Sequence, residues 1–160
     1  MKACYPGTFD PITNGHLDLI QRASRMFDEV DVLIMKNPRK KAMFTEAERT
    51  KMIRKCVASL PNVHVVVGEG LTVDYAARTG AGVIIRGIRA VADYEYELQQ
   101  ATANMMLNPD IETLFFVARP AYSFLSSSVA KEIGMNGGDI SKIVPAEIIP
   151  EVKRKFSRVR

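Results

Sequence analysis

Short apolar runs alternate along this chain with segments in which apolar residues recur at a helical spacing. Runs typical of buried strands lie at residues 1–5, 30–35, 63–67, 83–85 and 112–117. Helical spacing follows each run, at residues 17–27, 45–60, 71–78, 93–107 and 128–133, and a last amphipathic helix is expected from Pro145. Because each strand is followed by a helix, right-handed crossovers and a parallel sheet are expected. The pattern therefore predicts an α/β fold.

Turn-forming residues punctuate the chain without dividing it. No internal repeat, low-complexity tract or linker interrupts the alternation, so residues 1–160 are expected to form a single domain. The expected architecture is Rossmann-like, an open five-stranded parallel sheet with helices on both faces. In such sheets ligands bind outside the carboxyl ends of the strands, and the candidate functional residues are expected there.

The composition is that of an ordinary globular protein, with 47% hydrophobic and 25% charged residues. No apolar run reaches the length of a membrane span and the N-terminus lacks a signal-peptide pattern, so no membrane association is expected. Cys4 and Cys56 form no disulfide framework, and a reducing cytoplasm is the simplest location. The two histidines lack metal-ligand spacing, so we expect no metal site built from side chains.

The net charge of +4 is compatible with phosphorylated substrates and with weak nucleic-acid binding. A basic C-terminal segment, residues 153–160, permits the second alternative. The chain lacks aromatic residues interleaved on a basic face, however, so we expect no nucleic-acid partner.

The segment 5–16 joins the first strand to the first helix. Thr13 or Asn14 can cap that helix, which places His16 in its first turn. Backbone N–H groups and the helix dipole attract anions there and disfavour imidazolium, so His16 is expected to be a neutral hydrogen-bond donor. The alternative is an ordinary turn with a partly exposed histidine. The small residues nearby allow close approach of a phosphate and favour the functional interpretation: Gly7, Thr8 and Gly15.

Candidate site residues, most of them polar or cationic, follow all five expected strands. They are Thr8, Phe9 and His16; Arg39, Lys40 and Lys41; Leu71 and Thr72; Arg86 and Arg89; and the segment 123–128. Gathered at one sheet edge, these groups would suit a polyphosphate, whose transfer needs positioning and charge neutralisation. Taken singly, the basic loop is more typical of a solvated loop, the serines of a helix cap, and Glu97 of a surface charge. Neither Gly-x-x-x-x-Gly-Lys-Ser/Thr nor Gly-x-Gly-x-x-Gly occurs.

Two motifs resemble those of the nucleotidyltransferase superfamily. Residues 13–16, Thr-Asn-Gly-His, match its (His/Thr)-x-Gly-His signature, and residues 125–131 resemble its second signature. Lys131 ends the second motif where the superfamily usually has Arg, keeping the charge without the bidentate fork. Within the superfamily, residues 5–16, 85–97 and 122–128 are similar to the bacterial phosphopantetheine adenylyltransferase family.

This resemblance implies in-line attack of 4′-phosphopantetheine on the α-phosphorus of ATP, without a covalent intermediate and with Mg²⁺ accompanying ATP. His16 would stabilise the transition state. The implied acceptor-binding residues are Thr8, Lys40, Thr72 and Arg86. The implied ATP-binding residues are Thr8, Phe9, His16, Gly87, Ile88, Arg89, Glu97, Tyr122, Ser123, Phe124, Leu125, Ser126, Ser127 and Ser128.

The resemblance also implies a homo-oligomer, a hexamer built as a dimer of trimers, with coenzyme A as feedback inhibitor. One alternative is another nucleotidyltransferase, acting on nicotinamide mononucleotide or on a cytidylyl acceptor. The other is a non-catalytic nucleotide- or RNA-binding module.

Overall fold

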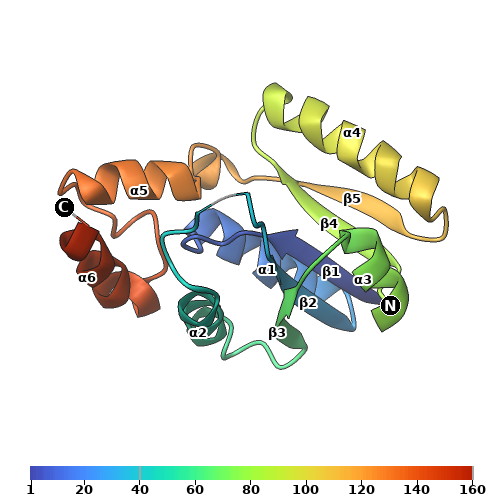
Figure 1. Ribbon diagram of the computed structural model, residues 1–160, viewed down its shortest axis with the longest axis horizontal. Coiled ribbons are helices and arrows are strands. Elements are labelled where there is room, and N and C mark those ends of the chain that lie inside the picture. Colours follow the sequence, from blue (N-terminus) through green and yellow to red (C-terminus); the bar gives the residue numbers. More distant parts are fainter. Residues whose placement is uncertain (40, 160) are drawn as a thin grey trace.

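The computed structural model describes residues 1–39 and 41–159. They form a five-stranded sheet with strand order β3-β2-β1-β4-β5, in which all neighbours are parallel (Figure 1). The strands are β1 (Lys2–Gly7), β2 (Glu29–Met35), β3 (Val63–Gly68), β4 (Val83–Ile88) and β5 (Glu112–Val117). The α-helices are α1 (Asn14–Met26), α2 (Glu46–Cys56), α3 (Thr72–Thr79), α4 (Val91–Leu107), α5 (Ser127–Met135) and α6 (Ile149–Val159). The expected open parallel sheet is confirmed.

The two faces of the sheet are buried by different helices. Tyr5 and Ile85 belong to a core cluster that includes buried residues of α1, α2, α5 and α6. Cys4 and Ile84, their neighbours in sequence, belong to a second cluster with buried residues of α3. Successive strand residues point to opposite faces, so both faces need an apolar cover. The expectation of helices on both faces is confirmed.

The chain order across the sheet changes direction between β1 and β4. From β1 the chain adds β2 and then β3 on one side, and then returns to place β4 on the other side of β1. The loops after β1 and β4 therefore diverge and leave a crevice at the carboxyl ends of these two strands. The segments expected to bind a ligand begin at this switch point.

Several expected boundaries differ from the structure; helix α2, for example, ends at Cys56 and not near residue 60. Strand β4 continues to Ile88 instead of ending at Ile85, and Arg86 and Gly87 pair with Phe115 and Phe116 of β5. A backbone ladder does not require apolar side chains, so the strand outlasts its apolar run. Arg86 thus lies within the strand, not after it. The final α-helix begins at Ile149, after a 3₁₀ turn at Ala146–Ile148.

Helix α2 shows how local sequence sets an element's start. Thr45 caps it by accepting the Glu48 N–H at 3.1 Å, and the Glu48 carboxylate accepts the Thr45 N–H at 2.7 Å. This is a capping box. Among the described residues, no helix has the length and hydropathy that a membrane span requires.

Candidate active site

The loop between β1 and α1 is shaped around Phe9. This residue is buried and has a φ of 50°, a left-handed conformation that costs a non-glycine residue about 1–3 kcal/mol. Its ring meets Tyr5 and His16 edge-on, with centroid distances of 5.4 and 5.1 Å. A Cβ on Gly7 would approach the ring to 3.0 Å, so glycine makes room for it. Phe9 therefore forms a wall against which the His16 imidazole rests.

His16 is held by the cap of α1. The ring atom Nδ1 of His16 accepts the Thr13 backbone N–H at 3.0 Å. The backbone N–H of His16 donates to Thr13 Oγ1 at 3.3 Å. Because Nδ1 is an acceptor, we assign the ring proton to Nε2. Burial, with a smaller contribution from Arg89, lowers the pKa of His16 from 6.5 to about 4. The imidazole is thus neutral near pH 7 and presents a fixed Nε2–H donor, as the sequence predicts.

Two arginines extend from the end of β4. Arg86 donates from Nε and Nη2 to the Glu97 carboxylate, at 2.5 and 2.8 Å, and from Nη1 to the Pro6 carbonyl at 3.3 Å. Burial opposes the charge of Arg86, but Glu97 outweighs it and raises the pKa of Arg86. Arg89 points differently, donating from Nη1 to the Leu125 carbonyl at 2.6 Å. The two guanidinium groups therefore serve different parts of the site.

The expectation of a surface charge at Glu97 is wrong. Glu97 is the buried residue of α4, 8% exposed, and its carboxylate is occupied by Arg86. Its partner lies on another element, so the helical pattern alone does not reveal the pair.

The serine-rich segment contributes the start of α5. Ser126 accepts the Val129 N–H at 3.1 Å and caps the helix, and Ser127 donates its hydroxyl to the Pro11 carbonyl at 2.8 Å. The positive ends of α1 and α5 consequently face the same space, which is favourable for an anion.

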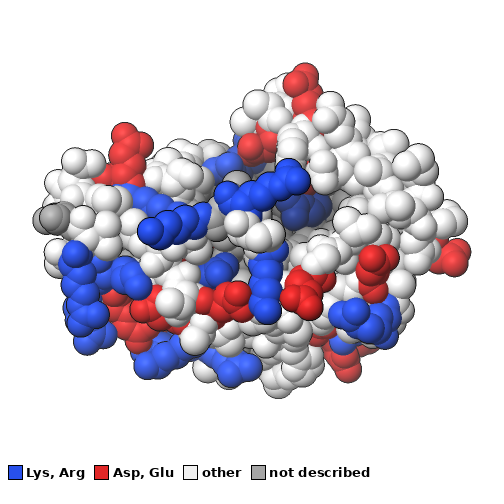
Figure 2. Space-filling view, viewed as in Figure 1, with Lys and Arg blue, Asp and Glu red and all other residues white. Residues whose placement is uncertain are grey.

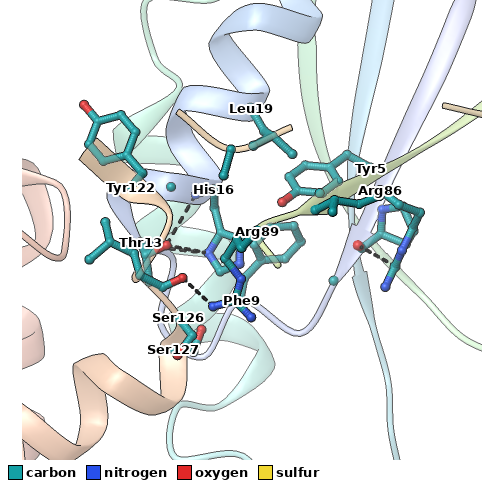
Figure 3. Close-up of a pocket in the computed structure, with 17 residues that line it drawn as sticks. Tyr5, Phe9, Thr13, His16, Leu19, Arg86, Arg89, Tyr122, Ser126 and Ser127 are labelled. Carbon is teal, nitrogen blue, oxygen red and sulfur yellow. Dashed lines mark hydrogen bonds between the residues drawn. The ribbon is translucent and has the colours of Figure 1, made fainter. Parts of the chain in front are cut away.

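These elements enclose a cavity of about 190 Å³ at the crevice between β1 and β4 (Figure 3). Figure 2 shows Lys and Arg side chains gathered beside the hollow in the middle of this face. The candidate residues that line the cavity are Phe9, His16, Arg86, Gly87, Ile88, Arg89, Tyr122, Leu125, Ser126 and Ser127. The structure therefore brings together one neutral donor, two cations and two helix starts.

Other candidates lie outside the lining of this cavity. They are Thr8, Thr72, Glu97, Ser123, Phe124 and Ser128. Thr72 is the first residue of α3, and Phe124 is 60% exposed. Lys40 falls outside the described residues.

Two of the buried charged residues that escaped the sequence interpretation lie beside the site. Asp10 and Arg49 are 2% and 5% exposed, and both brace the loop after β1. Arg49 donates to the Thr8 carbonyl at 2.8 Å and to the Phe44 carbonyl at 3.1 Å. The sequence could have drawn attention to Asp10 only through its place inside the first motif. Nothing in the sequence pattern of α2 distinguishes Arg49 from the other charged residues of that helix.

Known proteins resemble this chain over nearly its whole length. Residues 4–133 match the cytidylyltransferase-like family model. The chain is 50% identical over 156 residues to a phosphopantetheine adenylyltransferase of Finegoldia magna, which covers 98% of this chain and 96% of the relative. It is 52% identical over 153 residues to a phosphopantetheine adenylyltransferase of Clostridium tetani, covering 96% of both chains.

Proposed function

We infer that this chain, which belongs to the cytidylyltransferase-like family, transfers the adenylyl group of ATP to 4′-phosphopantetheine, giving dephospho-coenzyme A and pyrophosphate. The observation that carries this inference is identity of about half with two phosphopantetheine adenylyltransferases over nearly the whole chain. This is the penultimate step of coenzyme A synthesis.

The reaction asks little covalent chemistry of the protein. The acceptor phosphate is already an anion, so it attacks without a general base, and the transition state needs alignment and neutralisation of charge. His16 Nε2–H donates to a non-bridging oxygen of the α-phosphate as negative charge builds there. The Thr13 N–H holds the ring through Nδ1, so the donor is preorganised and need not reorient during transfer.

The two arginines divide the substrates. Arg86, beside the end of β1, binds the phosphate of phosphopantetheine together with Thr8 and Lys40, and Thr72 contacts the pantetheine arm. Arg89 lies against the segment that leads into α5 and therefore serves ATP. The remaining ATP contacts come from Phe9, residues 87–88, Glu97 and residues 122–128.

Magnesium enters with ATP in this proposal. The described residues that line the cavity include no Asp or Glu, and the described chain holds no cluster of three potential His, Cys, Asp or Glu ligands. Mg²⁺ is commonly held by substrate phosphates with few protein ligands, so this donor set fits a nucleotide-borne ion. Bound there, Mg²⁺ would neutralise phosphate charge.

The protein assembles as a hexamer, a dimer of trimers, in the cytoplasm. Helix α4 supports an assembly because its single buried residue among the described ones is Glu97. The exposed side of α4 and the neighbouring strand β5 carry many apolar side chains, and a contiguous apolar surface is typical of an interface between subunits. The exposed apolar residues of α4 and β5 are Val91, Tyr94, Tyr96, Leu98, Met105, Met106, Leu107, Leu114 and Val117. Sedimentation velocity on the purified protein tests the proposed mass.

Coenzyme A acts as a feedback inhibitor. It differs from the product by one phosphate and contains both the adenylyl and the pantetheine groups that the two subsites accept. Inhibition by coenzyme A that weakens as the concentrations of phosphopantetheine and ATP are raised would support binding of coenzyme A across both subsites.

The decisive assay measures pyrophosphate release and identifies the second product by mass spectrometry. ATP, Mg²⁺ and 4′-phosphopantetheine should yield pyrophosphate and dephospho-coenzyme A in equal amounts. Parallel reactions replace the acceptor with nicotinamide mononucleotide, or replace ATP with CTP and supply an alcohol phosphate. Faster turnover in either parallel reaction would reject the proposed acceptor. Binding of RNA without any turnover would favour a non-catalytic module.

A further inference from the structure

The carboxylate of Asp10 sits at a junction of three segments around the site. It accepts the Met43 N–H at 2.9 Å and the Phe44 N–H at 2.8 Å, and its Oδ2 is 2.6 Å from Lys131 Nζ. Asp10 is 2% exposed, so this charge is removed from water. A buried carboxylate of this kind depends on its hydrogen bonds and on a paired cation.

The same junction is reinforced by neighbouring contacts. Arg49 joins the Thr8 carbonyl to the Phe44 carbonyl, and Ser127 reaches the Pro11 carbonyl from α5. The loop after β1 is therefore tied both to the segment entering α2 and to the first turn of α5. In Figure 1 the connection from β2 to α2 and helix α5 lie on the same side of the molecule.

Lys131 lies one helical turn after Ser127, on the same face of α5. Its Nζ is engaged by Asp10, and neither Lys131 nor Asp10 is among the described residues that line the cavity. An ammonium group so placed compensates the buried carboxylate. It is not directed into the space where the substrate phosphates would bind.

We propose that Lys131 is a positioning residue that acts through Asp10, and that it is not a phosphate ligand. The pair anchors the backbone at Met43 and Phe44, two residues after Lys41 in the basic segment that the proposed function assigns to acceptor binding. It also anchors α5, whose start lines the nucleotide side. One ion pair, between a buried carboxylate and a partly exposed ammonium group, thus keeps the two substrate subsites in register.

This proposal and the alternative of direct phosphate binding predict different kinetics. Without Lys131, Asp10 loses its cation and the loop at residues 43–44 loosens, so binding of phosphopantetheine should suffer most. If Lys131 instead bound ATP phosphates, its loss would chiefly raise the KM for ATP. Replacing Asp10 in the same protein removes the uncompensated charge. The decrease in kcat/KM for phosphopantetheine in the double variant should therefore be smaller than the product of the decreases in the two single variants.

The test compares Lys131→Met, Lys131→Arg, Asp10→Asn and the double variant Asp10→Asn/Lys131→Met with the wild-type protein. Lys51→Met, an exposed lysine on α2, is the matched control. Thermal unfolding selects the conditions under which each variant is folded. Steady-state kinetics give KM for each substrate and kcat. This readout depends on the proposed function, so amide hydrogen exchange in peptides covering residues 41–45 provides an independent one.

For Lys131→Met we expect the kcat/KM for phosphopantetheine to fall on the order of tenfold or more, with the KM for ATP changed less than about threefold. Lys131→Arg should recover most of the loss. The double variant should be about as impaired as one single variant. Exchange at residues 41–45 should be faster in Lys131→Met and unchanged in Lys51→Met.

A rise confined to the KM for ATP, multiplicative losses in the double variant, or unchanged exchange at residues 41–45 would each overturn the proposal. If the wild-type protein shows no adenylyl transfer, the proposed function fails. The exchange experiment still decides whether Lys131 acts on this loop through Asp10.

Discussion

Replacing His16 separates two roles that the structure assigns to one side chain. In His16→Ala, the Nε2–H donor is lost, and removal of one preorganised donor of this kind lowers turnover by about 10²–10³-fold. The Thr13 backbone N–H also loses its hydrogen-bond acceptor. Thr13 is only 1% exposed, so water cannot easily replace that acceptor. An unsatisfied buried N–H costs about 1–3 kcal/mol. For a chain of this size each kcal/mol lowers Tm by roughly 2–4 °C.

His16→Gln distinguishes the two effects. A Gln at the third helical position can accept the N-cap N–H and complete a capping box, so stability should stay within about 0.5 kcal/mol of the wild type. The flexible amide cannot rest against Phe9 as the ring does, so turnover should still fall more than about tenfold. Initial rates of pyrophosphate release, measured under saturating substrates, and urea unfolding curves report the two quantities separately.

The reasoning would be refuted by a His16→Ala protein whose turnover lies within a few-fold of the wild type. It would also be refuted if His16→Gln restored turnover together with stability, because His16 would then act only as a helix cap.

Three further outcomes follow from the same geometry. Because the pKa of His16 is lowered from 6.5 to about 4, the unfolded chain gains its proton at a higher pH than the folded protein. The stability that neutral His16 contributes is therefore complete above pH 6.5 and is lost as the pH falls toward 4, by about 3 kcal/mol in all. Because the two proteins have similar stability near pH 7, the urea midpoints of the wild type should fall below those of His16→Gln over this range, and parallel pH curves would contradict the assigned environment. Arg86→Ala should raise the KM for phosphopantetheine about 10–100-fold and Arg89→Ala the KM for ATP by a similar factor, as expected for lost charge-assisted hydrogen bonds; equal effects on both substrates would reject the division. Chelation of Mg²⁺ with EDTA should abolish transfer and added Mg²⁺ should restore it, with pyrophosphate release as the readout; activity retained in EDTA would exclude a required metal.

Patterns that depend on neighbouring residues were readable in the sequence. The alternation of apolar runs and helical spacing predicts the parallel sheet, and the choice of Thr13 or Asn14 as a cap predicts the start of α1. The position of His16 in the first turn follows from the same local chemistry, whereas burial in the folded protein is the main cause of its lowered pKa. Strand propensity, helix periodicity and capping involve residues a few positions apart, so one sequence is enough to indicate them.

Tertiary structure alone decided which charges are buried and with whom. Glu97 pairs with Arg86 from another element, and Asp10 takes Lys131, which is 121 positions away in the chain, as its partner. The sequence shows such residues as ordinary charged positions. Burying such a charge costs too much free energy unless the fold supplies a partner of opposite charge. The order of residues along the chain does not identify that partner.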